Sequence, residues 1–588
     1  MRSRIGSSLA KIQGQEYAQI TSIPKDLRAI LNSSLPTRLL DLGQDISSVQ
    51  NITVSALRSK LATATVKLIT TPPNSRGRYL TLSHRWGDDE VFKLTKSSLS
   101  SFEHGIPFSS LGATFQDAIV VTKLLQHRYL WIDALCIVQD DEDDWERESS
   151  RMAAVYSNAS CTISAHTAQD SNAGFLDASL EPPPTLVLRS SRYFFNPRRT
   201  ITHLTLLGSF GDQVKRSFLS QRGWVFQERV LSRRLLHFVQ HHTFFEDAAA
   251  VVSDDVVSAD LPPLHRLEDN KWSVTDSCHG FVYWYRLVQN YSECSLTYEK
   301  DRLPAIAGLA QSFSEMNNPG RYMFGLWEKS LHIGLLWING SGRPLGRRNR
   351  QIEAEDSQSD RLTLTSRVSI DPSQHPEPAA GEVRDEDEPS SATQEEETDK
   401  EGKTTMANNG TTCTDKSAPL MPSWSWAACR GAVVYPKTIS DSMTSDIVLT
   451  GNSQSPQNGQ LGVDTRPSLM VEGPLVHLTT ALATRKQTDS PLHGLYTLTS
   501  ERSQFGTWVS LDHEAASESV VFPKLSCLRL CSLREADNSF VLRYETMFYF
   551  LLLEEIDGSE SGRYQRLGVG VTSQDHWKGV KRSEVEIA

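Results

Sequence analysis

Hydrophobic and polar positions follow the clearest order in one stretch of the chain, residues 130–165. An apolar run at 130–132 ends at Asp133 and is followed by a polar, acidic loop at 139–144. A helical pattern comes next, and a second apolar run occupies 161–164. This succession of strand, loop, helix and strand predicts an α/β domain. Ligands in such domains bind at the carboxyl ends of the strands.

The helix in this stretch has its own sequence signals. Asp143, with Glu146 three residues later, matches a capping box at the start of a helix. Trp145, Met152 and Tyr156 recur at helical spacing on one face. We therefore expect these three side chains to belong to the core.

The same patterns predict further elements on both sides. Apolar runs predict strands at 66–70 and 79–83, and an amphipathic pattern predicts a helix at 115–125. A helix is expected from Trp224, with a strand at 235–239 after it. Residues 272–326 are expected to be mostly helical, and the chain from 433 onward to be rich in strands.

Composition and charge change this picture in one segment only. The 588 residues are 38% hydrophobic with a formal net charge of −11, and residues 376–403 alone contribute −8. The remaining chain is therefore nearly neutral and has no basic surface typical of nucleic-acid binding. The acidic segment is poor in aromatic residues, so we expect it to be disordered.

The cysteines and the apolar segments argue against a zinc-binding, disulfide-stabilised, secreted or membrane-spanning protein. The eight cysteines include no CxxC pair, which argues against a zinc site and a disulfide framework. The amino terminus lacks the apolar centre of a signal peptide, and the apolar run at 547–553 is too short to span a bilayer. We expect a soluble, cytoplasmic protein that binds neither a membrane nor nucleic acid, and no cofactor is predicted.

Four clusters combine an aromatic residue with polar groups where strands end or helices begin. They are residues 83–87, Asp133 with Gln139 and Asp140, residues 222–229, and residues 422–426. Asp133 follows an apolar run directly, so its carboxylate has either a functional or a loop-structuring role.

Glu228 is the strongest single candidate for acid–base chemistry. Its helix also carries Trp224 and Gln227, and apolar surroundings raise the pKa of a carboxyl group. The alternative is a salt bridge to Arg229, Arg233 or Arg85. Ser83, His84 and Asp133 have the residue types of a hydrolase triad, but Ser83 is not in a GxSxG turn. The pair His237 and His241 lies on a strand and a loop without a third ligand, so no metal site is predicted.

Three of these segments resemble the motifs of the fungal heterokaryon-incompatibility (HET) domain. The segments are YLTLSHRWG at 79–87, residues 130–165, and SQRGWVFQERVLSRRLLHF at 220–238. The chain departs from the family pattern at Val138, where Asn is usual, and at 244–247, where a cysteine usually follows the last motif. The family is distantly similar to TIR domains, some of which cleave NAD. The resemblance thus implies a TIR/flavodoxin-like parallel sheet, and it implies that Glu228 corresponds to the catalytic glutamate of TIR domains.

The resemblance and the patterns together give a domain organisation. We expect an amino-terminal extension at 1–37, a HET domain with helical insertions at 38–240 (motif core 78–235), and a mostly helical segment at 241–345. A disordered acidic insertion at 346–420 and a β-rich carboxyl-terminal region at 421–588 follow.

Three functions remain open from the sequence. The first is a role in fungal non-self recognition and cell-death signalling, with a protein partner. The second is a cofactor-independent cyclase (pericyclase-type) or tailoring enzyme of a terpenoid or polyketide pathway, with an apolar substrate held by Trp86, Trp131, Trp224, Trp424 and Trp426. The third is TIR-like NAD cleavage. The candidate catalytic residues are Glu228, Asp133 and Ser83, and the candidate ligand-binding residues are His84, Arg85, Trp86, Gln139, Trp224, Gln227, Trp424 and Trp426.

Overall fold

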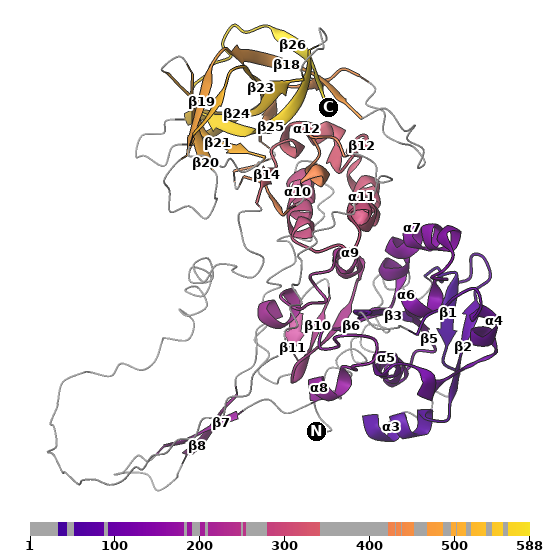
Figure 1. Cartoon of the computed structure of the whole chain (residues 1–588). Helices are drawn as coiled ribbons and strands as arrows, with labels where there is room; N and C mark the ends of the chain where they lie inside the picture. The colour runs from indigo at the N-terminus through magenta and orange to yellow at the C-terminus, as the bar shows by residue number, and fades with distance from the viewer. Residues whose placement is uncertain are drawn as a thin grey trace, which may run out of the picture. The chain divides into compact units, whose positions relative to one another are not determined.

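The computed structural model describes two long stretches of the chain with gaps (Figure 1). The described residues are 33–43, 52–87, 92–180, 185–190, 200–205, 210–247, 251–253, 279–340, 421–429, 431–436, 438–440, 442–451, 467–485, 495–500, 503–512, 519–536, 544–556 and 562–588. The acidic segment at 346–420, most of the amino-terminal extension, Cys278 and Cys413 lie outside them.

A nine-stranded mixed sheet organises the first part of the chain. Its order is β11-β10-β9-β6-β3-β5-β1-β2-β4. The strands are β1 (Arg38–Asp41), β2 (Thr65–Thr70), β3 (Tyr79–Ser83), β4 (Ile106–Pro107), β5 (Tyr129–Trp131), β6 (Cys161–Ala165), β9 (Leu235–Val239), β10 (His242–Glu246) and β11 (Val251–Ser253).

The centre of this sheet is parallel, and its edges are antiparallel. Strand β3 pairs in parallel with β5 and β6, and β6 pairs in parallel with β9. Numbered along the chain, these four strands lie in the order 2-1-3-4. The chain therefore leaves β3 and β6 in opposite directions, and such a switch point is where α/β sheets bind ligands. Ser83 ends β3 at this point and pairs with Ser164 of β6.

Helices connect the strands of this sheet. They are α3 (Val54–Leu61), α4 (Leu99–His104), α5 (Ala113–Leu124), α6 (Asp133–Cys136), α7 (Glu142–Asn158), α8 (Leu176–Leu180) and α9 (Gly223–Leu231). Helix α5 is buried on most sides, including Phe115, Ile119 and Val120, which explains the apolar run Ala118–Val121 at its centre. A separate hairpin joins β7 (Thr185–Ser190) to β8 (Thr200–Thr205).

Two predictions about α7 are wrong. The helix begins at Glu142 with Asp141 as its N-cap and no side-chain cap hydrogen bond, so Asp143 and Glu146 form no capping box. Trp145 is 36% exposed and packs against Trp224 instead of entering the core. Met152 and Tyr156 are buried as predicted.

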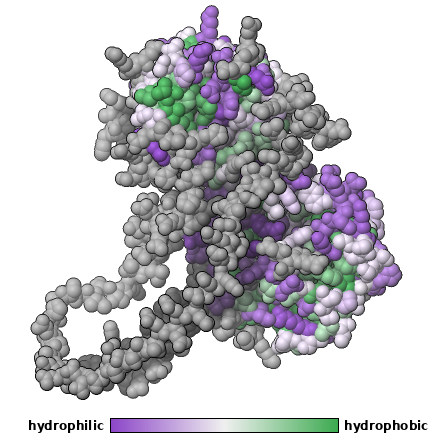
Figure 2. Space-filling view, in the orientation of Figure 1, coloured by the Kyte–Doolittle hydropathy of each residue, from purple (hydrophilic) through white to green (hydrophobic). Residues whose placement is uncertain are grey.

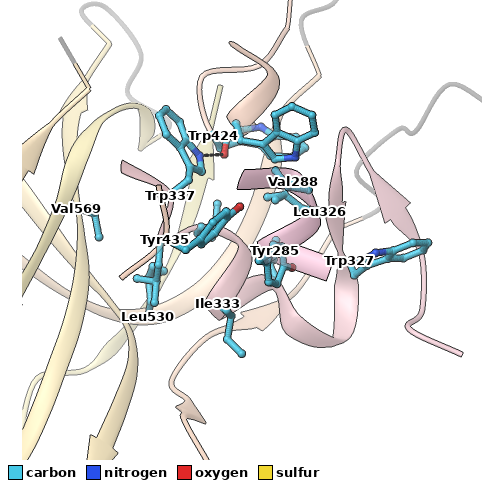
Figure 3. Packing of buried hydrophobic residues seen from close by; sticks show 14 of the residues in the cluster. Tyr285, Val288, Leu326, Trp327, Ile333, Trp337, Trp424, Tyr435, Leu530 and Val569 are labelled. Carbon is cyan, nitrogen blue, oxygen red and sulfur yellow. Dashed lines mark hydrogen bonds between the residues drawn. The ribbon is translucent and has the colours of Figure 1, made fainter. Parts of the chain in front are cut away.

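A second hydrophobic core lies between the helical segment and the carboxyl-terminal strands, reaching as far along the chain as Ile587. It involves α10 (His279–Ser292), α11 (Pro304–Asn317), α12 (Leu331–Gly334) and the short strands β12 (Tyr322–Met323), β13 (Leu326–Trp327), β14 (Ile338–Asn339) and β15 (Val433–Val434). Figure 3 shows aromatic side chains from these segments packed together, with the Trp337 indole N–H donating to the Trp424 carbonyl at 3.0 Å.

Strands dominate the remainder of the chain, as predicted. They are β16 (Thr444–Ser445), β17 (Val448–Leu449), β18 (Leu469–Leu478), β19 (Ala481–Arg485), β20 (Leu495–Ser500), β21 (Ser503–Leu511), β22 (Ser519–Phe522), β23 (Leu525–Ala536), β24 (Tyr544–Glu555), β25 (Arg563–Thr572) and β26 (Arg582–Ile587). Five of them, β23, β24, β25, β26 and β18, pair successively back to β23. This cycle is closed through only two residue pairs between β25 and β26, so it shortens the free edges of these strands and limits pairing with other chains.

The surface of the strand-rich region mixes polar and apolar residues. Figure 2 shows hydrophobic patches over the carboxyl-terminal strands. Two exposed apolar residues there, Leu482 and Val521, are direct cross-strand neighbours on β19 and β22. Within the described ranges, none of the helices combines the length and apolar character needed to cross a membrane.

Candidate functional site

The segment after β3 provides two side chains that are buried at the sheet's carboxyl edge. Ser83 ends the strand, and His84 follows it with its imidazole edge-on to Phe115, at 5.1 Å between ring centroids. Burial lowers the pKa of His84 to about 4, because desolvation outweighs the attraction of Asp133 and Arg222 adds repulsion. Neither ring nitrogen has a hydrogen-bond partner among the described residues. His84 is therefore neutral and unsatisfied at neutral pH.

The loop-structuring role that the sequence left open for Asp133 is found. It opens α6 after β5, and its Oδ1 accepts the Ala134 N–H at 2.8 Å. Its Oδ2 accepts the Trp86 indole N–H at 2.8 Å. The His84 Nδ1 lies 3.7 Å from Oδ1, too far for a hydrogen bond. Asp133 thus holds the loop and also places a negative charge beside His84.

Gln139 supports the same loop through its side chain. Its amide nitrogen donates to the carbonyls of Asp133 at 3.1 Å and Ile137 at 3.0 Å. Both of these hydrogen bonds have backbone carbonyls as acceptors, so Gln139 stabilises the loop that carries Asp133.

Glu228 lies on α9, buried to 5% exposure. Its Oε2 atom has no hydrogen-bond partner in the described part of the chain. Burial, then repulsion from Asp133, raises the pKa of Glu228 to about 7, although hydrogen bonding from Ser83, the Arg222 charge and hydrogen bonding from Tyr156 act in the opposite direction. A carboxyl group in this state exchanges a proton near neutral pH.

The expected salt bridge of Glu228 is not found. Arg229 pairs instead with Glu246, its Nε lying 3.3 Å from Oε2. Within the described chain, Arg85 and Arg233 likewise form no ion pair with Glu228. The carboxyl group of Glu228 is therefore left without a structural counter-ion in contact.

Hydroxyl groups fix α9 to the strands that carry Ser83 and Ser164. The Ser232 hydroxyl donates to the Glu228 carbonyl at 2.6 Å. The Thr162 hydroxyl of β6 lies 2.6 Å from the Ser232 hydroxyl, and because the Ser232 proton is already used, Thr162 is the donor of this bond. Thr81 of β3 lies 2.8 Å from Thr162 and continues the series. The start of the helix is held by Arg222, whose guanidinium donates to the His84 carbonyl at 3.0 Å.

Tyr156 is a member of this cluster that the sequence assigned only to the core. Burial, then the nearby Glu228 charge, raises the pKa of Tyr156 well above its ordinary value, so its hydroxyl remains a neutral donor. A tyrosine on an otherwise apolar helix face is the available signal, because a buried phenol needs a polar partner. Its partner on α9 is not visible from sequence spacing.

Other predicted ligand-binding residues lie in different surroundings. Trp224 donates to Asp301 at 3.2 Å, and Gln227 accepts the Gly308 N–H at 2.9 Å, so both side chains join α9 to the helical segment. Trp424 and Trp426 are fully buried in the second core. Arg85 is half-buried next to His84.

The five tryptophans proposed to line one apolar site are not gathered. Trp131 packs inside the first core against Tyr156, at 5.6 Å between ring centroids. Trp424 and Trp426 belong to the second core, as above. Trp86 is engaged by Asp133. In the described chain, no group of three or more His, Cys, Asp or Glu side chains is arranged to hold a metal ion.

Comparison with known proteins identifies the region that carries this cluster. Residues 79–228 match the family model described as "Heterokaryon incompatibility protein (HET)". The match begins at the first residue of β3 and ends at Glu228. No curated protein and no solved structure matches the chain significantly.

Proposed function

This chain is a heterokaryon-incompatibility (HET) domain protein, and from that premise we propose that it acts in fungal non-self recognition by cleaving NAD at the Glu228 cluster. Nicotinamide release by a HET domain would deplete NAD and so link recognition to cell death. A protein partner would supply the recognition step. The parallel strand order 2-1-3-4 supports the TIR/flavodoxin-like fold that this activity implies, because it is the order of flavodoxin-like sheets.

One observation carries the proposal: the Glu228 carboxyl is buried, has no counter-ion in contact among the described residues, and lies beside Ser83 at the sheet's switch point. Leaving a buried carboxyl unsatisfied costs stability. Perturbed carboxyl groups of this kind cluster at functional sites. The HET family match ends on the same residue.

The chemistry follows from the charge of Glu228. When the bond between nicotinamide and ribose breaks, its electron pair leaves with nicotinamide and positive charge develops on the ribose. An ionised Glu228 would stabilise that charge in a water-poor site. Water would then add to the ribose carbon and release its proton. The hydroxyls of Ser83 and Tyr156 would orient the carboxylate.

Nicotinamide release by the purified full-length chain tests this proposal. We expect wild type to release nicotinamide from NAD, with a rate that rises with pH around 7 as Glu228 ionises. Glu228→Gln keeps the shape but removes the charge and should lower the rate by about 100-fold or more.

Glu148→Gln is the matched control. Glu148 is 2% exposed on α7, and its Oε1 accepts no hydrogen bond among the described residues, but the same oxygen forms ion pairs with Arg147 and Arg151 outside the cluster. It should retain the wild-type rate. Absence of nicotinamide release by wild type, or equal rates in wild type and Glu228→Gln, would refute NAD cleavage through Glu228.

A further inference from the structure

Four polar side chains outside the Glu228 cluster form one continuous hydrogen-bonded series. Ser217 Oγ lies 2.7 Å from His166 Nδ1, and His166 Nε2 lies 2.9 Å from His237 Nδ1. His237 Nε2 lies 2.9 Å from Glu246 Oε2. All three separations are within ordinary hydrogen-bond length. The series therefore joins a serine hydroxyl to a carboxylate through two imidazoles.

The fold places each member from a different element. His166 follows β6 directly, and its backbone N–H donates to the Phe238 carbonyl at 3.1 Å. His237 is on β9, and Glu246 ends β10. Ser217 lies in the turn after the π-helix Gly211–Lys215. Since three members are anchored on paired strands, the relative positions of the two rings and the carboxylate are set by the sheet.

The donor of each hydrogen bond in this series follows from the Glu246 carboxylate. An ionised Glu246 can only accept, so His237 donates from Nε2 and its Nδ1 is a lone pair. His166 must then donate from Nε2, which leaves its own Nδ1 as an acceptor facing Ser217. This is the proton arrangement required for a histidine to act as general base toward a serine hydroxyl.

The electrostatics keep the series in that state. Burial raises the pKa of the Glu246 carboxyl, but the Arg229 charge and the His237 hydrogen bond together lower it well below its ordinary range. Burial lowers the pKa of His237 more than Glu246 raises it. Burial, then His237 and Arg229, also lowers the pKa of His166. Both imidazoles are consequently neutral at pH 7, and Nδ1 of His166 is free of a proton.

Ser217 itself is positioned for attack. It is half-buried, and the Ser220 N–H donates to its Oγ at 3.2 Å, which stabilises negative charge there. The Val214 carbonyl, 2.9 Å away, is a second acceptor for the same hydroxyl proton. The next residue, Phe218, is 71% exposed and offers an apolar surface beside the hydroxyl.

From this geometry we infer a second reactive site, in which Ser217 is an acyl-accepting nucleophile and His166 its general base, acting on esters of short apolar acids. Ser217 Oγ bonds to the acyl carbon as its proton passes to His166 Nδ1. The alcohol departs with the electron pair of the ester bond and takes that proton. Water then cleaves the acyl-serine by the same route, giving the free acid. His237, Glu246 and Arg229 act as positioning residues.

Phosphonylation with a fluorophosphonate probe tests the inference on the full-length chain. Attack by Ser217 on phosphorus displaces fluoride, and mass spectrometry of the digested protein locates the adduct. We expect the adduct on Ser217 and its absence from Ser217→Ala. Ser157→Ala is the matched control, because Ser157 is also half-buried but lies on α7 outside the series, where its hydroxyl donates to the Ala154 carbonyl at 3.4 Å. It should react at the wild-type rate.

The dependence of Ser217 labelling on His166 distinguishes a hydroxyl that a general base activates from one that is merely exposed. His166→Gln should slow labelling of Ser217 by about 100-fold, the usual contribution of a general base. In wild type, labelling should persist below pH 6.5, because the neutral form of His166 is favoured by burial. Glu246→Gln should lower the rate, and Glu246→Asp should restore part of it.

A second measurement uses p-nitrophenyl butyrate, a short apolar acyl ester. Wild type should release a burst of nitrophenol equal to the protein concentration, and Ser217→Ala should not. Absence of an adduct on Ser217 in wild type would overturn the proposal. Labelling of Ser217 at an unchanged rate in a folded His166→Gln protein would overturn it as well.

Discussion

Arg566 and Glu228 are both buried charged residues, in the carboxyl-terminal strands and the HET region respectively, and the chain treats them in opposite ways. The Arg566 guanidinium donates to both oxygens of Asp512, at 2.8 and 3.2 Å, and to the carbonyls of Leu335 and Trp337, at 2.7 and 2.5 Å. It also stacks 3.6 Å above the Trp337 ring. Glu228 has an oxygen with no partner in the described chain and carries a raised pKa.

Arg566 and Glu228 show two ways of burying a charged side chain, one with partners that replace the lost water and one without them. A buried ion is tolerated when hydrogen bonds and an opposite charge replace the water it has lost. Arg566 meets this condition and joins β25 to the segment around Trp337. Glu228 does not meet it, although arginines lie nearby in sequence. The raised pKa of the Glu228 carboxyl is the consequence, and it is the property on which the proposed function depends.

Removing the satisfied ion should have the largest effect. Arg566→Ala leaves the Asp512 carboxylate buried and unpaired, so we expect the free energy of unfolding to fall by about 3–5 kcal/mol. Urea denaturation monitored by tryptophan fluorescence measures this loss. Arg582→Ala is the control, because its ion pair with Glu472 is exposed and should contribute under about 1 kcal/mol. Equal losses in the two variants would show that the buried Arg566 ion pair stabilises the fold no more than an exposed pair does.

Weakening the loop beside Glu228 should have an intermediate effect. Trp86→Phe removes the indole donor that Asp133 Oδ2 accepts at 2.8 Å. We expect a loss of about 1–2 kcal/mol in the free energy of unfolding, since a hydrogen bond to a charged, partly exposed group is lost. A double-mutant cycle with Asp133→Ala should show that the two losses are not additive. Additive losses would mean that Trp86 acts on stability independently of Asp133.

The contact between α9 and the helical segment should have the smallest effect. Trp224→Phe keeps an aromatic ring against Trp145 but removes the 3.2 Å hydrogen bond to Asp301. The expected loss is about 1 kcal/mol. Since the lost hydrogen bond goes to Asp301 and not to the Glu228 carboxyl, the pH dependence of nicotinamide release should be unchanged. A shifted pH dependence would show that the helical segment tunes Glu228.

The sequence predicted those strands and helices whose apolar residues are buried on several sides. The strands at 79–83 and 235–239 match β3 and β9, and the predicted helix at 115–125 overlaps α5, because apolar runs there meet a core on several sides. The start of α7 was missed, since several acidic residues in one loop can each serve as a cap. Trp145 was misplaced because helical spacing does not show which face another segment will cover.

The candidate site was predicted in part. Glu228, Asp133, Ser83 and His84 come together because each lies next to the carboxyl edge of a parallel strand or on the helix that packs there. Tyr156 and Arg222 were not given roles, because their partners depend on how α7 and α9 approach the sheet. Trp424 and Trp426 were grouped with the site by residue type, although their burial in the second core follows from contacts far along the chain.

We would first compare the free energy of unfolding of Glu228→Gln with that of wild type from pH 4.5 to 8, which tests whether Glu228 is buried as an unpaired carboxyl group. The pKa of Glu228 is about 7 in the folded chain against an ordinary value of 4.5, so the folded state binds more protons than the unfolded state between these pH values. The contribution of Glu228 to stability therefore falls as pH rises through this window.

The variant has no charge to desolvate. We expect that its advantage over wild type appears above pH 4.5, reaches about 1–3 kcal/mol near pH 7, and levels off toward pH 8. Equal or lower stability of Glu228→Gln at pH 8 would contradict the claim that Glu228 is held as an unpaired, functional carboxyl.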